Sequence, residues 1–251
     1  MDESLNKQVS KQRTKQSNEH EKEQSNKKSN GTNALPILYS LRNCPYAMRA
    51  RIAIFKAQQT VLLRDLVLSN KPEQMLKASP KGTVPVIVLS NDTVIEESLE
   101  VMLWALNESD PNNLLHQNIG NALPDMLKLI NAFDHEFKVC LEQYKCAKRY
   151  KEANLIEQRE ACELYIKSLE VRLSLHTFLM SDKESLVDIA LLPFIRQFAR
   201  IERQWYLQSP YPKVRQWLNN YLQSPMFTRV MAKYPLWLDS QEEVFFGGQG
   251  K

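Results

Sequence analysis

One cysteine of the chain stands where a thiol would be reactive. Cys44 directly precedes Pro45 in the stretch "RNCPYAMRA", which otherwise reads as the opening of a helix. Proline is favoured at the first helical position, so Cys44 is expected just before the first turn. The unpaired backbone N–H groups of that turn favour thiolate over thiol, and Arg42 and Arg49 flank the cysteine. Cys44 is therefore either a nucleophile or a small residue that caps a helix.

The other three cysteines carry no such signal. Cys140, Cys146 and Cys162 form no C-x-x-C pair, and the four histidines have no ligand spacing around them. Cys140 and Cys146 are six positions apart, which places them on roughly opposite faces of a helix. We therefore predict no metal site, and we expect these three cysteines to be small buried apolar residues.

Two further stretches have the residue types that hold a peptide-like ligand. In "GTVPVI", Pro85 interrupts a strand pattern and marks an edge, a bulge or a cis bond. If the Val84–Pro85 bond is cis, the N–H and C=O of Val84 turn outward and offer a backbone dock. In "IEESLE", Glu97 and Ser98 lie at a strand-to-helix junction that suits the carboxylate and ammonium of an α-amino acid. An edge proline and an ordinary helix cap are the alternatives.

The elements that position these residues form a small α/β domain. Hydrophobic patterning predicts strand, helix, strand, helix, strand, strand and helix, in that order, at 36–40, 45–59, 61–68, 71–79, 83–89, 93–97 and 98–109. Helical periodicity dominates afterwards, with expected helices at 122–150, 152–180, 185–205, 213–222 and 225–233. The predicted architecture is α/β followed by all-α.

The domain boundaries follow from composition. Residues 1–33 hold only three aliphatic side chains, too few to offset the cost of ordering the backbone, so we expect a disordered tail. The rest divides into an α/β domain at 34–107, a linker at 108–120, a helical domain at 121–240 and a flexible C-terminus at 241–251.

Charge and hydropathy exclude several classes of partner. The net charge is +4, and the first 33 residues carry half of it, with seven Lys/Arg and five Asp/Glu. The remainder has no basic stripe of the kind that nucleic-acid binding requires. No apolar run approaches the ~18 residues of a membrane span, and the N-terminus lacks a secretory h-region. We expect a cytoplasmic protein with reduced thiols and without a membrane or nucleic-acid partner.

Taken together, the motifs resemble those of a known family. "NCPYAMR", "LSNKPEQMLKASPKGTVPVI" and "IEESLEVMLWAL" are similar, in order and spacing, to the N-terminal domain of cytosolic glutathione transferases, most closely the cysteine-containing omega class. "SLVDIALLPFIRQF" resembles the capping box of the family's helical domain, with Ser185 and Asp188 in the box. The resemblance implies a thioredoxin-like glutathione-binding domain, a helical glutathione-transferase C-terminal domain and a homodimer.

The resemblance also implies roles for individual residues. Cys44 matches the catalytic cysteine, which forms a mixed disulfide with glutathione. Lys71 matches a lysine that meets the glycine carboxylate of glutathione, and Val84 matches the residue whose backbone pairs with the cysteinyl part. Glu97 and Ser98 match the pair that holds the γ-glutamyl end. For Glu97 and Ser98, the residue types alone also indicate a site for an α-amino acid end. Lys71, by contrast, is assigned a role only by the family resemblance.

The implied activity is thiol–disulfide exchange with glutathione as co-substrate. Cys44 attacks a glutathione mixed disulfide, and a second glutathione resolves the adduct. Ala47 stands where a dithiol motif would have its second cysteine, so a monothiol route is expected. The second substrate is a small thiol, disulfide or electrophile, and dehydroascorbate reduction fits the same site.

Three alternative functions remain open, and so does activation of glutathione by a residue other than Cys44. The first alternative is a conjugating transferase in which Cys44 only holds glutathione. The second is a non-catalytic partner protein of the stringent starvation type, and the third is a protein of the chloride intracellular channel type. Other transferase classes activate glutathione with a tyrosine or serine close to the positions of Tyr39 and Ser40. Tyr39 lies within the first predicted strand, so we expect it in the core.

Overall fold

A five-stranded mixed sheet organises the first half of the chain. The computed structural model describes residues 34–248, so the tail predicted at 1–33 lies outside the described residues. The strands, in their order across the sheet, are β4 (Val94–Ile95), β3 (Val86–Val88), β1 (Ile37–Ser40), β2 (Val61–Asp65) and β5 (Val244–Phe246). β1 and β2 run parallel and the other neighbours are antiparallel. The predicted strand–helix order of the α/β domain is confirmed.

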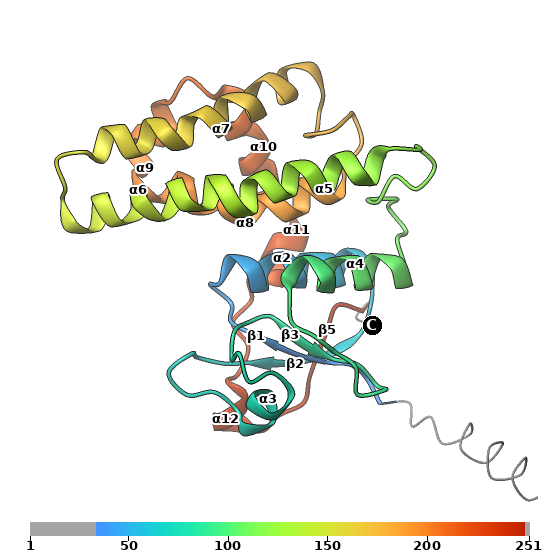
Figure 1. Ribbon diagram of the computed structural model, residues 1–251. Coiled ribbons are helices and arrows are strands. Elements are labelled where there is room, and N and C mark those ends of the chain that lie inside the picture. The colour runs from blue at the N-terminus through green and yellow to red at the C-terminus, as the bar shows by residue number, and fades with distance from the viewer. Residues whose placement is uncertain (1–33, 249–251) are drawn as a thin grey trace, which may run out of the picture.

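Three helices flank this sheet. α2 (Pro45–Lys56) and α4 (Ser98–Glu108) pack against each other on the face nearest the helical domain, and the short α3 (Glu73–Ala78) covers the opposite face (Figure 1). Alanines at 47, 50 and 53 of α2 are buried, and small side chains allow the helix to approach its neighbours closely. The result is the predicted thioredoxin-like layer arrangement.

The second half of the chain is helical. The stretch predicted as one helix at 122–150 is continuous but contains a π-helical turn, giving α5 (Ala122–Ala132), η1 (Phe133–Phe137) and α6 (Lys138–Tyr150). The remaining helices are α7 (Leu155–Leu175), α8 (Leu186–Ile201), α9 (Arg203–Gln208), α10 (Pro212–Leu222), α11 (Pro225–Val230) and α12 (Trp237–Ser240). α8 is buried along most of its length and packs against α2, which joins the two domains. No helix in the described range 34–248 is long and apolar enough to cross a bilayer.

The predicted capping box at the start of α8 is confirmed. Asp188 is fully buried, and its carboxylate accepts hydrogen bonds from the Ser185 N–H at 3.0 Å and from the Ser185 hydroxyl at 2.7 Å. The same carboxylate accepts from the Leu179 N–H at 2.9 Å and from the Trp217 indole at 3.0 Å. One side chain thus fixes a helix start, a loop and a neighbouring helix.

The C-terminal segment differs from the prediction. The sequence predicts a flexible end at 241–251, yet Val244–Phe246 form β5, which pairs with the outer edge of β2. Phe246 lies opposite Val61 and is 3% exposed, so burial of its ring holds the strand in place. A three-residue strand gives too little periodicity for sequence patterning to detect.

The predicted helix at 185–205 and the predicted burial of three cysteines also need correction. The helix breaks at Glu202, whose backbone leaves the helical region at φ −126° and ψ 73°.

Cys162 is buried as expected, but Cys140 is only partly buried and Cys146 is exposed. Cys146 belongs to the solvent side of α6, where helical spacing rather than residue type decides exposure.

Candidate active site

Cys44 lies at the junction between β1 and α2, as predicted. It is the N-cap residue of α2, with an extended backbone at φ −74° and ψ 124°, and its carbonyl accepts the first helical hydrogen bond, from the Met48 N–H at 2.9 Å. The backbone N–H groups of Tyr46 and Ala47 precede that first bond and have no partner within the helix. These N–H groups lie at the same end of α2 as Cys44, which is partly buried.

The loop before β3 faces this cysteine. Of the three readings left open for Pro85, the structure has the cis one, at the Val84–Pro85 peptide bond, and the Cys44 thiol donates a weak hydrogen bond to the Val84 carbonyl at 3.8 Å. Cys44 and Val84 are 40 positions apart in the sequence. The fold therefore places a thiol beside the loop that carries the cis peptide bond.

Ser98 and Glu97 stand at the start of α4. Ser98 is 3% exposed, and its hydroxyl oxygen accepts a hydrogen bond from Arg49 Nε at 2.9 Å. Because the oxygen accepts from arginine, the hydroxyl proton is left to be donated to a ligand carboxylate. Glu97 is largely exposed and pairs with the ammonium of Lys81. Glu97 therefore accepts from an ammonium, but that ammonium belongs to a lysine of the same chain.

Arg49 connects the α/β domain to the helical domain. Its two terminal nitrogens donate to the two carboxylate oxygens of Asp134 at 2.8 and 2.9 Å, a bidentate pair that is largely buried. The guanidinium also lies 5.2 Å from the ring centre of Tyr46. Burial raises the pKa of Tyr46, and the nearby charge of Asp134 raises it further. Arg49 therefore points toward Ser98 and the domain boundary rather than toward Cys44.

These groups enclose a cavity of about 310 Å³ between the domains. Four of the predicted site residues line it, namely Val84, Pro85, Glu97 and Ser98. Cys44 is not among the lining residues but touches the wall through Val84. Lys71 is also outside the lining set: its ammonium lies next to Gly82, where a Cβ on that glycine would meet it at 3.0 Å.

Several lining residues were not identified from the sequence. Lys81, Asp134 and His135 contribute to the wall, and Asp134 and His135 come from the helical domain. The His135 ring contacts the Asn131 carbonyl through Nδ1 at 3.0 Å. The pair of Arg49 and Asp134 spans 85 positions, so no local pattern signals it. Within residues 34–248, no group of three His, Cys, Asp or Glu side chains is arranged to hold a metal ion.

A fully buried thiol provides a contrast with Cys44. Cys162 is fully buried on α7, and burial raises its pKa to about 12, with smaller contributions from Cys140 and Glu163. A thiol with that pKa is almost entirely protonated at neutral pH. Position in the fold thus separates one accessible thiol at a helix start from one inert thiol in the core.

Two family models match the chain, one to each half. The model described as "Glutathione S-transferase, N-terminal domain" matches residues 38–113, and the model described as "Glutathione S-transferase, C-terminal domain" matches residues 128–225. The matched ranges contain the cavity-lining residues of both domains.

Individual proteins give the same result. The chain is 25% identical over 190 residues to glutathione S-transferase omega-1 of Mus musculus, covering 75% of this chain and 77% of the mouse protein. It is 26% identical over 193 residues to glutathione S-transferase omega-2 of Rattus norvegicus, covering 75% of each. Among solved structures, a glutathione transferase family member from Pseudomonas fluorescens pf-5, with two glutathione bound, superimposes with a TM-score of 0.68 at 17% identity, over 78% of this chain and 92% of that one.

Proposed function

Since the chain belongs to the glutathione S-transferase family and is related to its omega class, we propose that it transfers thiol groups through a mixed disulfide between Cys44 and glutathione. One observation carries this proposal. The thiol of Cys44 lies at the N-terminus of α2 and 3.8 Å from the Val84 carbonyl, so a nucleophile and a backbone dock occupy one place.

Glutathione would lie across the cavity with its cysteinyl part at Val84. Its γ-glutamyl end reaches the start of α4, where the Ser98 hydroxyl donates to the carboxylate and Glu97 accepts from the ammonium. Lys81 pairs with Glu97, so the ligand ammonium would share or replace that partner. Lys71, next to Gly82, is our proposed partner for the glycine carboxylate.

The reaction runs in two exchanges. The Cys44 thiolate attacks the glutathionyl sulfur of a mixed disulfide, the Cys44–glutathione S–S bond forms, and the original S–S bond breaks. The released thiolate takes a proton from water and leaves as a thiol. A second glutathione thiolate then attacks the adduct, which forms glutathione disulfide and restores the Cys44 thiolate. The net change is one mixed disulfide plus one glutathione giving one thiol and one glutathione disulfide.

The test compares wild-type, Cys44→Ser and Cys146→Ser proteins. The substrate is the mixed disulfide of glutathione and 2-mercaptoethanol, with glutathione in excess, and turnover is measured. We expect Cys44→Ser to lose at least about 100-fold in turnover, while Cys146→Ser, which removes an exposed thiol on α6, keeps wild-type activity. Mass spectrometry of the wild type after one exchange should find glutathione on the Cys44 peptide.

Three other outcomes would contradict this function. If the three proteins turn over equally, Cys44 is not the nucleophile. If none turns over although glutathione binds, the fold serves a non-catalytic partner role. Faster conjugation of glutathione to 1-chloro-2,4-dinitrobenzene than disulfide exchange would favour the conjugating alternative. A cytoplasmic location, expected from the sequence, and a homodimeric state, implied by the family resemblance, remain predictions; light scattering of purified protein tests the second.

A further inference from the structure

A π-helical turn places two side chains of the helical domain at the candidate active site. η1 (Phe133–Phe137) interrupts the helix that runs from α5 into α6. Such turns account for fewer than about 1% of residues in soluble proteins and occur frequently at functional sites. The turn carries Asp134 and His135, which are the residues that the helical domain contributes to the lining of the 310 Å³ cavity.

The neighbours of His135 fix the position of this turn. Asp134 pairs with Arg49 of α2, and Glu136 accepts a hydrogen bond from the Tyr165 hydroxyl of α7 at 3.0 Å. The turn is thus anchored to an element of each domain. His135 stands between these two residues with an exposed side chain that lines the cavity.

One hydrogen bond determines the tautomer of His135. Its Nδ1 lies 3.0 Å from the carbonyl oxygen of Asn131, one turn earlier in the helix. A carbonyl oxygen only accepts, so Nδ1 carries a proton and, in the neutral ring, Nε2 presents a lone pair. Within the described range 34–248, Nε2 has no hydrogen-bond partner. His135 therefore brings a vacant acceptor to the cavity.

The carboxylates of the same cavity, by contrast, already accept from donors of the chain. Each lining carboxylate has such a donor: Asp134 has Arg49, Glu97 has Lys81 and Glu96 has the Ser79 hydroxyl. An ammonium group has three N–H donors, so it needs more than one acceptor. A ligand ammonium that shares Glu97 with Lys81 would still have N–H groups to place, and Nε2 of His135 can accept one of them.

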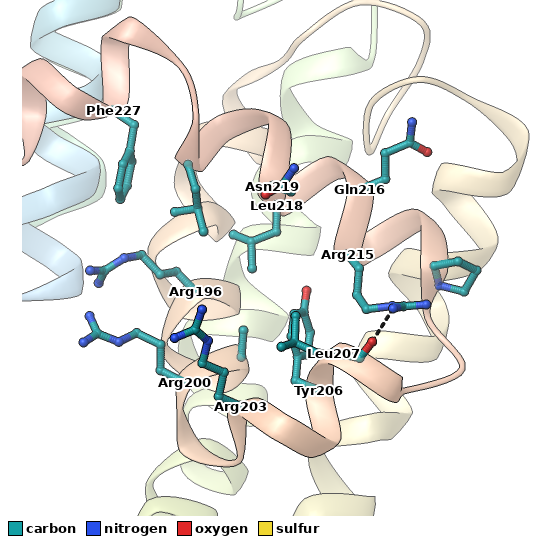
Figure 2. Close-up of a pocket in the computed structure, with 13 residues that line it drawn as sticks. Arg196, Arg200, Arg203, Tyr206, Leu207, Arg215, Gln216, Leu218, Asn219 and Phe227 are labelled. Atoms are coloured by element: carbon teal, nitrogen blue, oxygen red, sulfur yellow. Dashed lines mark hydrogen bonds between the residues drawn. The ribbon is translucent and has the colours of Figure 1, made fainter.

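The larger cavity of the helical domain does not suit a group that carries an ammonium. It has a volume of about 760 Å³, lies between α8, α9, α10 and α11, and shares no lining residue with the candidate active site (Figure 2). Its wall has no acidic side chain but four arginines, namely Arg196, Arg200, Arg203 and Arg215. Like charges repel, so of these two cavities the smaller one is suited to an α-amino acid end.

We propose that His135 is a specificity-determining residue, whose Nε2 accepts a hydrogen bond from the ammonium of the γ-glutamyl group of glutathione. This inference rests on the thiol-transfer function proposed above. Ser98 and Glu97 belong to the α/β domain and His135 to the helical domain, so one chain contacts the α-amino acid end from both sides. A thiol peptide without the α-ammonium loses the contact and is bound less well.

The test measures binding of S-methylglutathione, which has no free thiol, by isothermal titration calorimetry at pH 8. His135→Asn keeps a donor for the Asn131 carbonyl but ends short of the Nε2 position. It should weaken binding about tenfold, the effect of one hydrogen bond to a charged group. His135→Gln can place its amide oxygen near the Nε2 position, and should bind within about threefold of wild type.

A second ligand locates the effect on the ammonium. S-methylated glutaryl-cysteinyl-glycine differs from S-methylglutathione only in lacking the α-ammonium, and it should bind wild type and His135→Asn with equal affinity. Glu136→Gln, a change one residue away whose side chain contacts Tyr165 instead of lining the cavity, should leave the affinity for both ligands unchanged. Circular dichroism checks that each variant folds.

The outcomes separate this inference from the function on which it rests. Unchanged binding of S-methylglutathione in His135→Asn, or equal weakening of both ligands, would overturn the role of His135 and leave the thiol-transfer function intact. No binding of S-methylglutathione to wild type would overturn both. In the disulfide-exchange assay, His135→Asn should raise KM for glutathione about tenfold at unchanged kcat, because the proposed contact is remote from the reacting sulfurs. A fall in kcat at unchanged KM would contradict the proposed contact.

Discussion

We expect the cysteines of this chain to differ in reactivity because the fold places them differently. Cys44 is partly buried at the start of a helix, Cys146 is exposed on α6, and Cys162 is fully buried in the core, where burial raises its pKa to about 12. Reactivity toward an alkylating reagent needs both access and thiolate. Cys162 meets neither requirement, whereas Cys44 lies at a helix N-terminus, a position where nucleophilic cysteines are found.

Brief treatment of the native protein with iodoacetamide at pH 7.5 should therefore modify Cys44 fastest and leave Cys162 untouched. Peptide mass spectrometry at several times gives the rate at each site. In urea all four cysteines should react at similar rates, which serves as the control for peptide detection. Faster modification of Cys146 than of Cys44 would show that the helix N-terminus does not activate the thiol.

Arg49 acts on the site through another side chain, since it orients Ser98 and pairs with Asp134. Arg49→Lys keeps the charge but cannot make the bidentate pair and the serine contact at once. In a Cys44→Ser background, which prevents covalent capture, we expect glutathione affinity to fall about tenfold, equivalent to ~1.4 kcal/mol. Arg42→Lys, an equal change on the other side of Cys44, is the control. Unchanged affinity in Arg49→Lys would mean that Ser98 needs no positioning.

At the scale of elements, the start of α8 depends on one buried carboxylate. Ser185→Ala removes one capping contact and should lower the free energy of unfolding by about 1 kcal/mol. Asp188→Asn places an amide N–H₂ where donors already point, and should cost about 3 kcal/mol. Urea denaturation measures both, with Ser174→Ala on the exposed side of α7 as a control expected within about 0.5 kcal/mol of wild type. Equal losses for Ser185→Ala and Asp188→Asn would contradict this ranking.

The carboxylate of Glu202, at the break between α8 and α9, accepts hydrogen bonds from α6 and α7. The stability that these hydrogen bonds contribute depends on pH. Burial alone would raise the pKa of Glu202, but hydrogen bonds from Tyr144, Lys148 and Arg159 outweigh burial and hold it below the ordinary value of 4.5. The unfolded chain then binds more protons than the folded chain near that value. The stabilisation is therefore complete above pH 4.5 and is lost as pH falls through the lower, folded pKa.

Glu202→Gln should consequently be less stable than wild type by about 1–3 kcal/mol at pH 7. The difference should shrink as the pH falls below 4.5. Denaturation of both proteins across this pH range measures it, and Glu160→Gln, an exposed change on α7, should track wild type throughout. A difference that is the same at pH 3 and pH 7 would show that the charge of Glu202 is not the stabilising element.

The sequence could predict elements whose own residues restrict the backbone, and it could not predict contacts between residues far apart in the chain. Pro45 is favoured at a first helical position, so the helix start at Cys44 followed from residue type, whereas Pro85 left a cis bond as one of three possibilities. The pair of Arg49 and Asp134 has no such signature, because its members belong to different domains and meet only after both have folded. The break at Glu202 escaped detection for a similar reason: apolar periodicity continues through it, and tertiary hydrogen bonds stabilise the irregular backbone.

At the scale of the whole molecule, the last described strand completes the first domain. Phe246 of β5 is buried against β2, whereas its neighbour Phe245 is 64% exposed. Phe246→Ala should lower the free energy of unfolding by about 3 kcal/mol. Phe245→Ala, the same change one residue away, should stay within about 0.5 kcal/mol of wild type. Similar small effects of both would mean that β5 contributes little to the folded state.

The pairing of β5 with β2 has a consequence for the order in which the protein is made. A ribosome releases the α/β domain first, but β5 is synthesised only after the entire helical domain. Until then the edge of β2 has unpaired backbone groups, a state that promotes association between nascent chains. The α/β domain cannot complete its sheet until β5 has been synthesised. We therefore expect nascent chains on neighbouring ribosomes of one messenger RNA to be the species that most need a chaperone.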